Sequence, residues 1–240
     1  MIRLITIDCW DTVLRNNAVW DDRLVDIAYA AFRSAQPDID RQTLVAAFSA
    51  ENADFYRTLR DEMITPLLMS RLRTLAACAH VSISESALLQ LQTEFEAAIL
   101  SPLPELMPGV QRFLSNVKNR QVKVCLVCNT GWFSSRAIDS ALQRCGVFQF
   151  FDFFAYSDRV GSAKPSTRIF EFALSVAACR PDEAIHIGDK VTTDVVGAQK
   201  AGLCAIHYHP GGTCADPTML CACDYEEIWA ILSSRFTAKC

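Results

Sequence analysis

The stretch that decides the fold is HIGDKVTTDVVGAQKAG, residues 186–202. Its apolar start ends in Gly188 and Asp189, and a second acid, Asp194, precedes a run of small residues. This order predicts a buried strand, an acidic loop and a short helix. Units of this kind are typical of parallel sheets, in which functional groups gather at the carboxyl ends of the strands.

The same alternation extends over the second half of the chain. We expect helices over 110–118, 134–145, 167–178, 195–201 and 225–236, and strands over 122–127, 151–156, 184–187 and 204–208. A further apolar run over residues 2–7 adds a strand at the start of the chain. Because parallel strands covered on both faces read as nearly continuous apolar runs, the pattern predicts an α/β fold with a Rossmann-like, doubly wound parallel sheet.

A long block in the first half of the chain has helical rather than alternating periodicity. Leu88, Leu91 and Phe95 fall on one helical face, and Ser84 before them is a candidate N-cap. Three prolines close to its end mark a linker back to the alternating pattern. We therefore expect a sheet core over residues 1–14 and 106–240, with an all-helical domain inserted over residues 15–105.

Composition and charge exclude several classes of protein. The chain has 240 residues and a formal net charge of −4, with its lysines and arginines scattered. This distribution argues against binding to nucleic acid or to an anionic membrane through a basic face. No segment resembles a signal peptide, and no apolar run approaches the roughly 20 residues of a membrane span. We expect a cytoplasmic protein that is a monomer or a homodimer.

Eleven cysteines in a chain of this length suggest buried thiols rather than a disulfide framework. One loose grouping contains the residue types that bind zinc: His207, His209, Cys214, Cys221 and Cys223. Its spacing fits no familiar zinc pattern, so we do not expect a zinc site there.

Polar side chains follow the apolar runs where the predicted strands end. These residues are Asp8, Asn129, Lys164 and Asp189, and Asp194 follows in the same loop as Asp189. Three carboxylates that meet at one sheet edge offer the oxygen ligands that Mg²⁺ prefers. A lysine beside them can balance their charge and hold an anionic intermediate.

These residues resemble the motifs of the haloacid dehalogenase superfamily of aspartate-nucleophile hydrolases. The resemblance covers nearly the whole chain, and it is carried by the Asp8 strand, the helical insertion, Val-Cys-Asn129-Thr130-Gly131, Ala163-Lys164-Pro165 and GDKVTTD-VVGAQKAG. An insertion directly after the first strand is similar to the helical-cap (C1) subclass. Residues 15–105 are accordingly expected to form a helical cap domain.

The resemblance implies a role for each motif residue. Asp8 would attack phosphorus and form an aspartyl-phosphate, as carboxylate nucleophiles do. Lys164 would pair with Asp8 and with the transferring phosphoryl group. The expected cofactor is Mg²⁺, held by Asp8, the main-chain carbonyl of Trp10, Asp189 and Asp194.

Two positions depart from the family pattern. The resemblance implies that Cys128, Asn129 and Thr130, together with Trp10, line the phosphate and substrate site. Trp10 stands where the family's phosphatases have a second aspartate as general acid, a function worth about 10²–10⁴ in rate. Cys128 stands where serine or threonine is usual, and a thiol is a weak donor. Asp11 is expected to point away from the leaving group and not to replace the missing acid.

Three functions remain open at this point. The favoured one is a phosphatase that hydrolyses a small, anionic phosphorylated metabolite with a leaving group that needs little protonation. A 2-haloacid dehalogenase also has an aromatic residue at the position of Trp10, but Gly188, Asp189 and Asp194 argue against that activity. The third is a binding or regulatory protein with impaired catalysis. A Schiff-base mechanism through a cap lysine is excluded, because residues 15–105 contain no lysine.

The expected cap is rich in arginine. Arg57, Arg60, Arg71 and Arg73 all lie in it. Any of them can meet an anionic substrate, although a solvated helix face is the commoner position for such side chains. Trp132 directly follows the Asn129-Thr130-Gly131 motif and is a candidate wall of the substrate site.

Overall fold

The computed structural model describes residues 1–212 and 218–237, with the side chains of residues 236 and 237 excepted. The chain divides into two compact units by its internal contacts. The first unit comprises Met1–Asn16, Glu105–Asn129 and Cys145–Cys240, and the second comprises Asn17–Pro104 and Thr130–Arg144.

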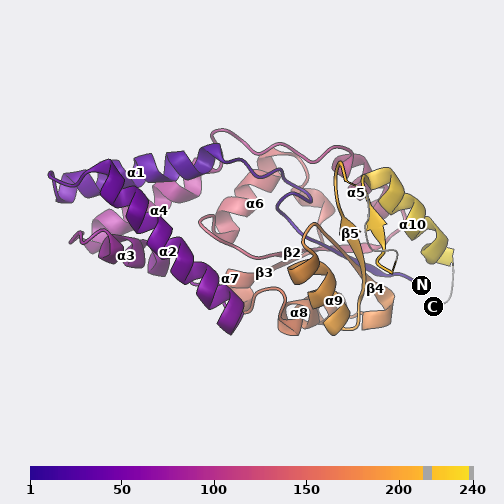
Figure 1. The fold of residues 1–240 in the computed structure, drawn as a ribbon. Helices are drawn as coiled ribbons and strands as arrows, with labels where there is room; N and C mark the ends of the chain where they lie inside the picture. Colours follow the sequence, from indigo (N-terminus) through magenta and orange to yellow (C-terminus); the bar gives the residue numbers. More distant parts are fainter. Residues whose placement is uncertain (213–217, 238–240) are drawn as a thin grey trace. The chain divides into compact units, whose positions relative to one another are not determined.

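A six-stranded sheet forms the centre of the first unit (Figure 1). Its strands are β1 (Leu4–Ile7), β2 (Lys123–Cys128), β3 (Phe153–Tyr156), β4 (Ala184–Gly188), β5 (Cys204–Tyr208) and β6 (Cys221–Ala222). They lie in the order β3-β2-β1-β4-β5-β6, and every neighbouring pair is parallel. β1 and β4 are therefore central and fully buried, which is why their residues are mostly apolar, with Thr6 and His186 as the exceptions. The predicted α/β fold with a parallel sheet is confirmed.

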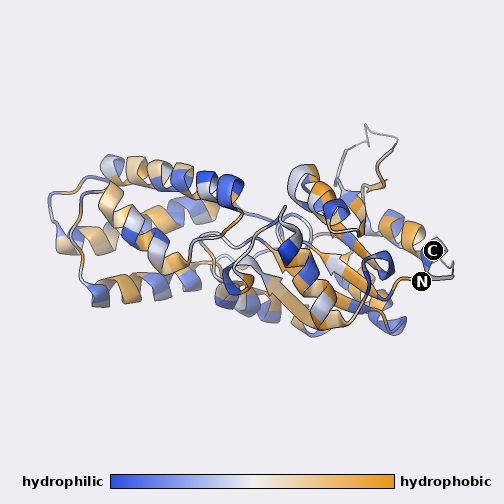
Figure 2. Cartoon of the chain, turned by 90° about the horizontal axis from the view of Figure 1, so that it is seen from below, coloured by the Kyte–Doolittle hydropathy of each residue, from blue (hydrophilic) through white to orange (hydrophobic). Residues whose placement is uncertain are grey.

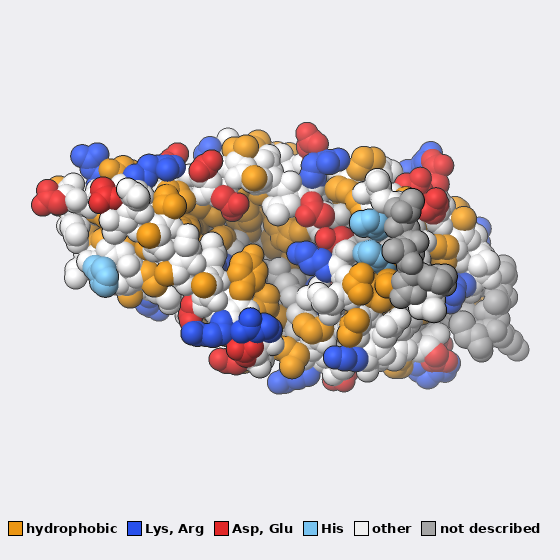
Figure 3. Space-filling model, viewed as in Figure 1, with side chains coloured by type: hydrophobic (Ala, Val, Ile, Leu, Met, Phe, Trp, Pro, Cys, Tyr) orange, Lys and Arg blue, Asp and Glu red, His pale blue; other side chains and the backbone are white. Residues whose placement is uncertain are grey.

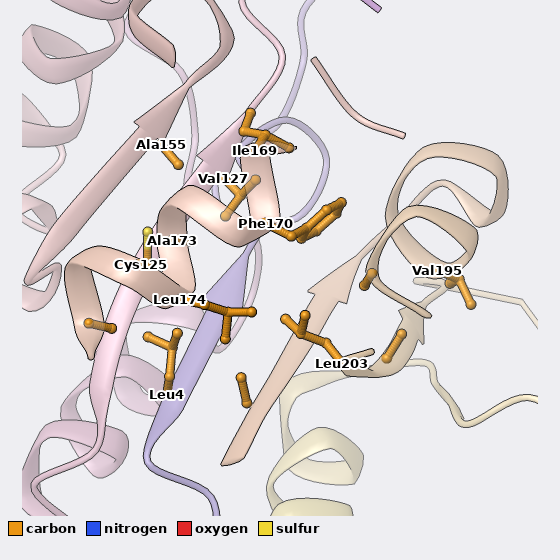
Figure 4. Packing of buried hydrophobic residues seen from close by; sticks show 14 residues of the cluster. Leu4, Cys125, Val127, Ala155, Ile169, Phe170, Ala173, Leu174, Val195 and Leu203 are labelled. Atoms are coloured by element: carbon orange, nitrogen blue, oxygen red, sulfur yellow. The ribbon is translucent and has the colours of Figure 1, made fainter. Parts of the chain in front are cut away.

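Helices cover both faces of this sheet. The first unit contains α5 (Val110–Asn119), α7 (Ser157–Val160), α8 (Thr167–Ala177), α9 (Val196–Lys200) and α10 (Tyr225–Thr237). α8 buries Phe170 and Leu174 against the strands, around Leu4 and Val127 (Figure 4). Ala198 of α9 belongs to the same cluster. Figure 1 draws α5 and α10 on the other side of the sheet.

The sequence placed most of these elements to within one or two residues. It did not predict α7, β6 or the π-helical turn Val191–Val195 that precedes α9. The expected helix over 195–201 is shorter, at Val196–Lys200, because this π-helical turn occupies its start. A two-residue strand and a four-residue helix are too short to show a hydrophobic period.

The second unit is entirely helical. It contains α1 (Val19–Ala35), α2 (Arg41–Glu62), α3 (Leu68–Cys78), α4 (Glu85–Ala98) and α6 (Ser135–Arg144). Ser84 caps α4 as predicted, because its hydroxyl oxygen accepts from the Ala87 amide at 3.3 Å. Asp40 caps α2 in the same way, through the Thr43 amide at 2.7 Å.

Apolar residues are concentrated in the strands and on the inner sides of the helices (Figure 2). None of the helices in the described ranges combines the length and the apolar composition that a membrane crossing requires. Acidic and basic side chains are interspersed over the face shown in Figure 3.

Candidate active site

A buried lysine joins two buried carboxylates at the carboxyl end of the sheet. Asp8 directly follows β1, and its amide continues the pairing with β4 by donating to the Ile187 carbonyl at 2.9 Å. The Lys164 Nζ donates to Asp8 Oδ1, and it also donates to Asp194 Oδ1 at 2.6 Å. The three residues are only 7%, 2% and 1% exposed for Asp8, Lys164 and Asp194, so these interactions act in a medium of low polarity.

Asn129 holds the backbone of Lys164. Its Oδ1 accepts from the Lys164 amide at 2.7 Å, and its Nδ2 donates to the Lys164 carbonyl at 2.9 Å. The next residue, Pro165, follows a cis peptide bond and packs closely against α9. A Cβ on Gly197 would lie 3.0 Å from the Pro165 Cα, so this approach needs glycine. The loop that carries Lys164 is therefore fixed from both sides.

Asp194 is held on both of its oxygens. Its Oδ2 accepts from the Lys190 amide at 2.9 Å within the π-helical turn. A Cβ on Gly188 would lie 2.5 Å from the Asp194 Cγ, so only glycine at the end of β4 lets the carboxylate sit there. Gly188 is thus required for the packing of Asp194 against the end of β4.

A histidine that the sequence analysis did not single out completes the cluster. His186 on β4 is fully buried, with Nε2 3.3 Å from Asp194 Oδ1 and Nδ1 2.9 Å from the Thr6 hydroxyl. Burial holds the pKa of His186 below its ordinary value, which favours the neutral ring. Because the Asp194 carboxylate can only accept, Nε2 carries the proton and Nδ1 accepts from Thr6.

The cluster has more negative than positive charge. Burial, reinforced by Asp194 and opposed by Lys164, raises the pKa of Asp8. Burial would also raise the pKa of Asp194, but Lys164 and His186 outweigh it and the pKa lies below its ordinary value. Burial, with the charges of Asp8 and Asp194, raises the pKa of Asp189 to about 7. Three carboxylates thus share one ammonium group, an arrangement that suits an added cation.

The geometry of the carboxylates fits a metal ion. Asp8, Asp189 and Asp194 each offer an oxygen, and these three atoms lie within 4.8 Å of one another. Within the described part of the chain this is the one such group of histidine, cysteine or acidic residues. An all-oxygen donor set is the type that Mg²⁺ prefers. His207 supports the group from β5, because its Nε2 lies 2.9 Å from the Asp189 carbonyl.

His207, His209, Cys221 and Cys223, the described members of the loose grouping of zinc-binding residue types, do not form such a group, and Cys214 lies outside the described residues.

The loop after Asp8 makes a tight turn, and Trp10 in it is half-buried. Asp11 has a left-handed backbone, with φ of 55°, and its Oδ1 accepts from the Asn16 amide at 2.9 Å. Its amide donates to the Leu14 carbonyl at 2.7 Å. Asp11 is therefore engaged in shaping the loop.

The remaining predicted site residues lie at the end of β2. Cys128 is fully buried, and its thiol lies 3.5 Å from the Asn129 carbonyl, a weak interaction. Thr130 is buried and begins the stretch of the second unit that follows Asn129. From the sequence, Asn129 is recognisable only as a polar residue at a strand end. Its two hydrogen bonds with the Lys164 backbone were not predicted.

The family model of haloacid dehalogenase-like hydrolases matches residues 2–202. The chain belongs to this family. The resemblance drawn from Asp8, Lys164 and the Gly188-Asp189 motif is thereby confirmed.

One curated relative within the family is a phosphatase. A glyceraldehyde 3-phosphate phosphatase of Methanothermobacter thermautotrophicus is 45% identical over 65 residues, which are 27% of this chain and 29% of that protein. The chain matches less than half the length of the first curated relatives, at 41% and 29%.

Among solved structures, a 2-haloacid dehalogenase of Pseudomonas syringae pv. Tomato has a TM-score of 0.71, with 20% identity over 98% of this chain and 100% of that one. The magnesium-bound hydrolase YfnB of Bacillus subtilis has a TM-score of 0.63, with 20% identity over 96% and 98%. At this identity the two structures share the fold with this chain.

Proposed function

We propose that this protein is a Mg²⁺-dependent hydrolase of small phosphorylated metabolites, with Asp8 as the nucleophile. The observation that carries the proposal is the arrangement of Lys164 between Asp8 and Asp194, with the Asp189 carboxylate beside them. The similarity to a phosphatase over part of the chain supports the choice of a phosphate ester.

Asp8 has the position and the charge that a nucleophile needs. The Lys164 ammonium opposes the rise in the pKa of Asp8 and so favours the carboxylate that reacts. An Asp8 oxygen forms a bond to phosphorus while the bond from phosphorus to the leaving oxygen breaks, and that oxygen departs with the electron pair. Water then cleaves the aspartyl-phosphate, which releases phosphate and regenerates Asp8.

Mg²⁺ would be held by the carboxylates of Asp8, Asp189 and Asp194, with the Trp10 main-chain carbonyl as a further ligand. When bound, it neutralises negative charge on the phosphoryl group and on the carboxylates. Lys164 supplies a fixed positive charge to the same region, and Asn129 keeps its backbone in place.

Trp10 narrows the range of substrates. An indole cannot donate a proton to a leaving oxygen as a carboxylic acid does, and Asp11 is held by the Asn16 amide. Without a general acid, a leaving group that is stable as an anion is favoured. Acyl phosphates and aryl phosphates meet this condition, whereas alkyl monoesters do not.

We also propose that residues 15–105 act as the cap domain of the family and that Cys128, Asn129 and Thr130 form the phosphate end of the site. Cys128→Ser tests this assignment, because a hydroxyl donates a stronger hydrogen bond than a thiol. The variant is expected to lower KM for a phosphate ester. An unchanged KM would contradict a phosphate contact at this position.

The test of the function is a substrate screen with and without Mg²⁺. We expect phosphate release from acetyl phosphate and p-nitrophenyl phosphate that needs Mg²⁺ and is lost in Asp8→Asn. Asp11→Asn is the matched control, and it should retain activity if folded. Halide release from 2-chloropropionate without Mg²⁺ would instead identify a dehalogenase. Mg²⁺ binding with no turnover of any of these compounds would identify a binding protein.

A further inference from the structure

Arg71 is an arginine in the interior of the helical unit. It lies on α3 and is 2% exposed. Its Cζ lies 3.8 Å from the centre of the Phe55 ring and 3.7 Å from the Trp132 ring. The planar guanidinium is thus held between two aromatic rings, an arrangement that fixes its orientation.

Part of this guanidinium is used for structure. Nε donates to Glu51 Oε1 at 2.7 Å, and Nη2 donates to Glu51 Oε2 at 2.6 Å. Nη2 also donates to Asn52 Oδ1 at 2.9 Å, and the same oxygen accepts from Trp132 Nε1 at 3.0 Å. These bonds connect α2, α3 and the residues before α6, and they explain why the ion pair tolerates burial.

The third nitrogen of the Arg71 guanidinium, Nη1, takes no part in these bonds. Its two N–H groups have no hydrogen-bond acceptor among the residues that the structure describes. In the described ranges, Nη1 is not among the fully buried side-chain atoms that lack a hydrogen-bond partner. Nη1 is therefore still accessible, although the rest of the side chain is enclosed.

The residue next to Nη1 is a glycine, Gly131. A Cβ built on Gly131 would lie 3.8 Å from Nη1, which is ordinary van der Waals contact. The adjacent Trp132 ring is itself fixed, because it packs on Phe48 and Phe95 with ring centres 5.2 Å and 5.6 Å away. Nη1 thus lies beside the Gly131 backbone and next to a Trp132 ring that is fixed by its neighbours.

We propose that Arg71 Nη1, framed by Gly131 and Trp132, is a binding site for a carboxylate. Nη1 offers two donors and no acceptor, so its ligand must supply acceptor oxygens. Glu51 neutralises the charge of the guanidinium, so the site selects by hydrogen bonding and shape more than by net charge. The Phe55 and Trp132 rings cover the faces of the guanidinium, so an acceptor reaches Nη1 only in the guanidinium plane, which favours a planar carboxylate over a tetrahedral phosphate.

Direct titration tests the site without any dependence on turnover. Propionate is added to the ¹⁵N-labelled protein, and the indole N–H signal of Trp132 is followed by NMR, because this group shares Asn52 Oδ1 with Arg71. We expect a saturable shift with propionate and a weaker response to inorganic phosphate. No saturable shift with propionate, or tighter binding of phosphate, would overturn the proposal.

Two variants remove Nη1 or cover it. Gly131→Ala adds a methyl group in front of Nη1 and is compatible with the backbone, and Arg71→Lys keeps a cation for Glu51 but lacks Nη1. Loss of a charge-assisted hydrogen bond predicts about tenfold or weaker binding of propionate in each. Arg73→Lys is the matched control, because Arg73 lies on the same helix and pairs with the exposed Glu85. Unchanged binding in Gly131→Ala and Arg71→Lys would contradict the assignment.

A second arm separates the two sources of the carboxylate, and it rests on the proposed phosphatase activity. If the carboxylate belongs to the substrate, Gly131→Ala raises KM for an aryl phosphate that also carries a free carboxylate, but not for p-nitrophenyl phosphate. If it belongs to a separate ligand, propionate changes the rate with p-nitrophenyl phosphate in the wild type but not in Gly131→Ala. An effect in neither assay would overturn a role of this site in turnover, while the titration still reports on binding.

Discussion

The side chain of Asn129 forms two hydrogen bonds with the backbone of Lys164, one with its amide at 2.7 Å and one with its carbonyl at 2.9 Å. These two bonds connect the end of β2 to the loop that delivers the ammonium group to Asp8. The position of Lys164 therefore depends on a residue that does not touch its side chain.

Asn129→Ala should reduce kcat/KM by about 10–100-fold, as removal of a supporting partner commonly does. The loss is expected mainly in kcat, because the Lys164 ammonium is displaced rather than removed. Steady-state kinetics with p-nitrophenyl phosphate provide the measurement. Ser140→Ala, a change on α6 whose hydroxyl donates to the Arg136 carbonyl of the same helix, serves as a control. Wild-type kcat in a folded Asn129→Ala protein would show that Lys164 does not need this support.

Lys164→Met should destabilise the protein strongly. The variant keeps the volume of the side chain but leaves the buried Asp8 and Asp194 without their shared cation. Removal of one partner from a buried ion pair costs about 3–5 kcal/mol. Chemical denaturation measures the change, and Lys118→Met is the control. Lys118 pairs with Asp152 at 2.6 Å but is 33% exposed. A loss in Lys164→Met no larger than in Lys118→Met would contradict the buried cluster.

Binding of Mg²⁺ should release a proton near neutral pH. The metal-free Asp189 has its pKa raised to about 7 by burial and by the nearby Asp8 and Asp194, against an ordinary value of 3.8. In the metal-free protein, this group contributes most to stability below pH 3.8, and the contribution is lost as the pH rises through about 7. Mg²⁺ binds the ionised carboxylate, so its affinity and its stabilising effect should increase from about pH 6 to about pH 8.

Calorimetry in buffers with different ionisation enthalpies detects this proton directly. Asp189→Asn should abolish the pH dependence and weaken binding, whereas Asp182→Asn, an exposed change, should leave both unaltered. An Mg²⁺ affinity that is constant over this pH range would contradict the link to Asp189.

Trp10→Asp should improve hydrolysis of an unactivated alkyl monoester. A carboxylic acid two residues after the nucleophile can protonate the leaving oxygen, and general acid catalysis is worth up to about 10²–10⁴ in rate. The gain with p-nitrophenyl phosphate should be much smaller, since its leaving group needs no proton. Comparing the two substrates isolates proton donation from other effects. Equal gains, or none in a folded variant that binds Mg²⁺, would show that Trp10 does not limit the reaction.

The sequence predicted the sheet and its acids because both depend on local patterns. Runs such as β4 are apolar except for His186, and Asp8, Asp189 and Lys164 stand where these runs and their loops end. A parallel sheet brings such ends to one edge, so their proximity follows from the topology. The sequence also indicated Ser84 as a helix cap, since capping depends on residues three positions apart.

The supporting contacts could not be predicted in this way. Asn129 and Lys164 are 35 residues apart, and the contact of His186 with Thr6 spans 180 residues. A buried histidine in an apolar strand carries no local sign of its partners. Periodicity likewise identified the helices of residues 15–105 but not which arginine turns inward, a choice that depends on Glu51, Phe55 and Trp132 around Arg71.

The central claim is that Asp8 forms a covalent bond to phosphorus. The most direct measurement is mass spectrometry of protein quenched in acid during turnover of acetyl phosphate with Mg²⁺. The account predicts one added phosphoryl group on the peptide that carries Asp8, lost on hydroxylamine treatment and absent from Asp8→Asn. Mg²⁺-dependent phosphate release by Asp8→Asn at the wild-type rate, with no adduct in either protein, would contradict it.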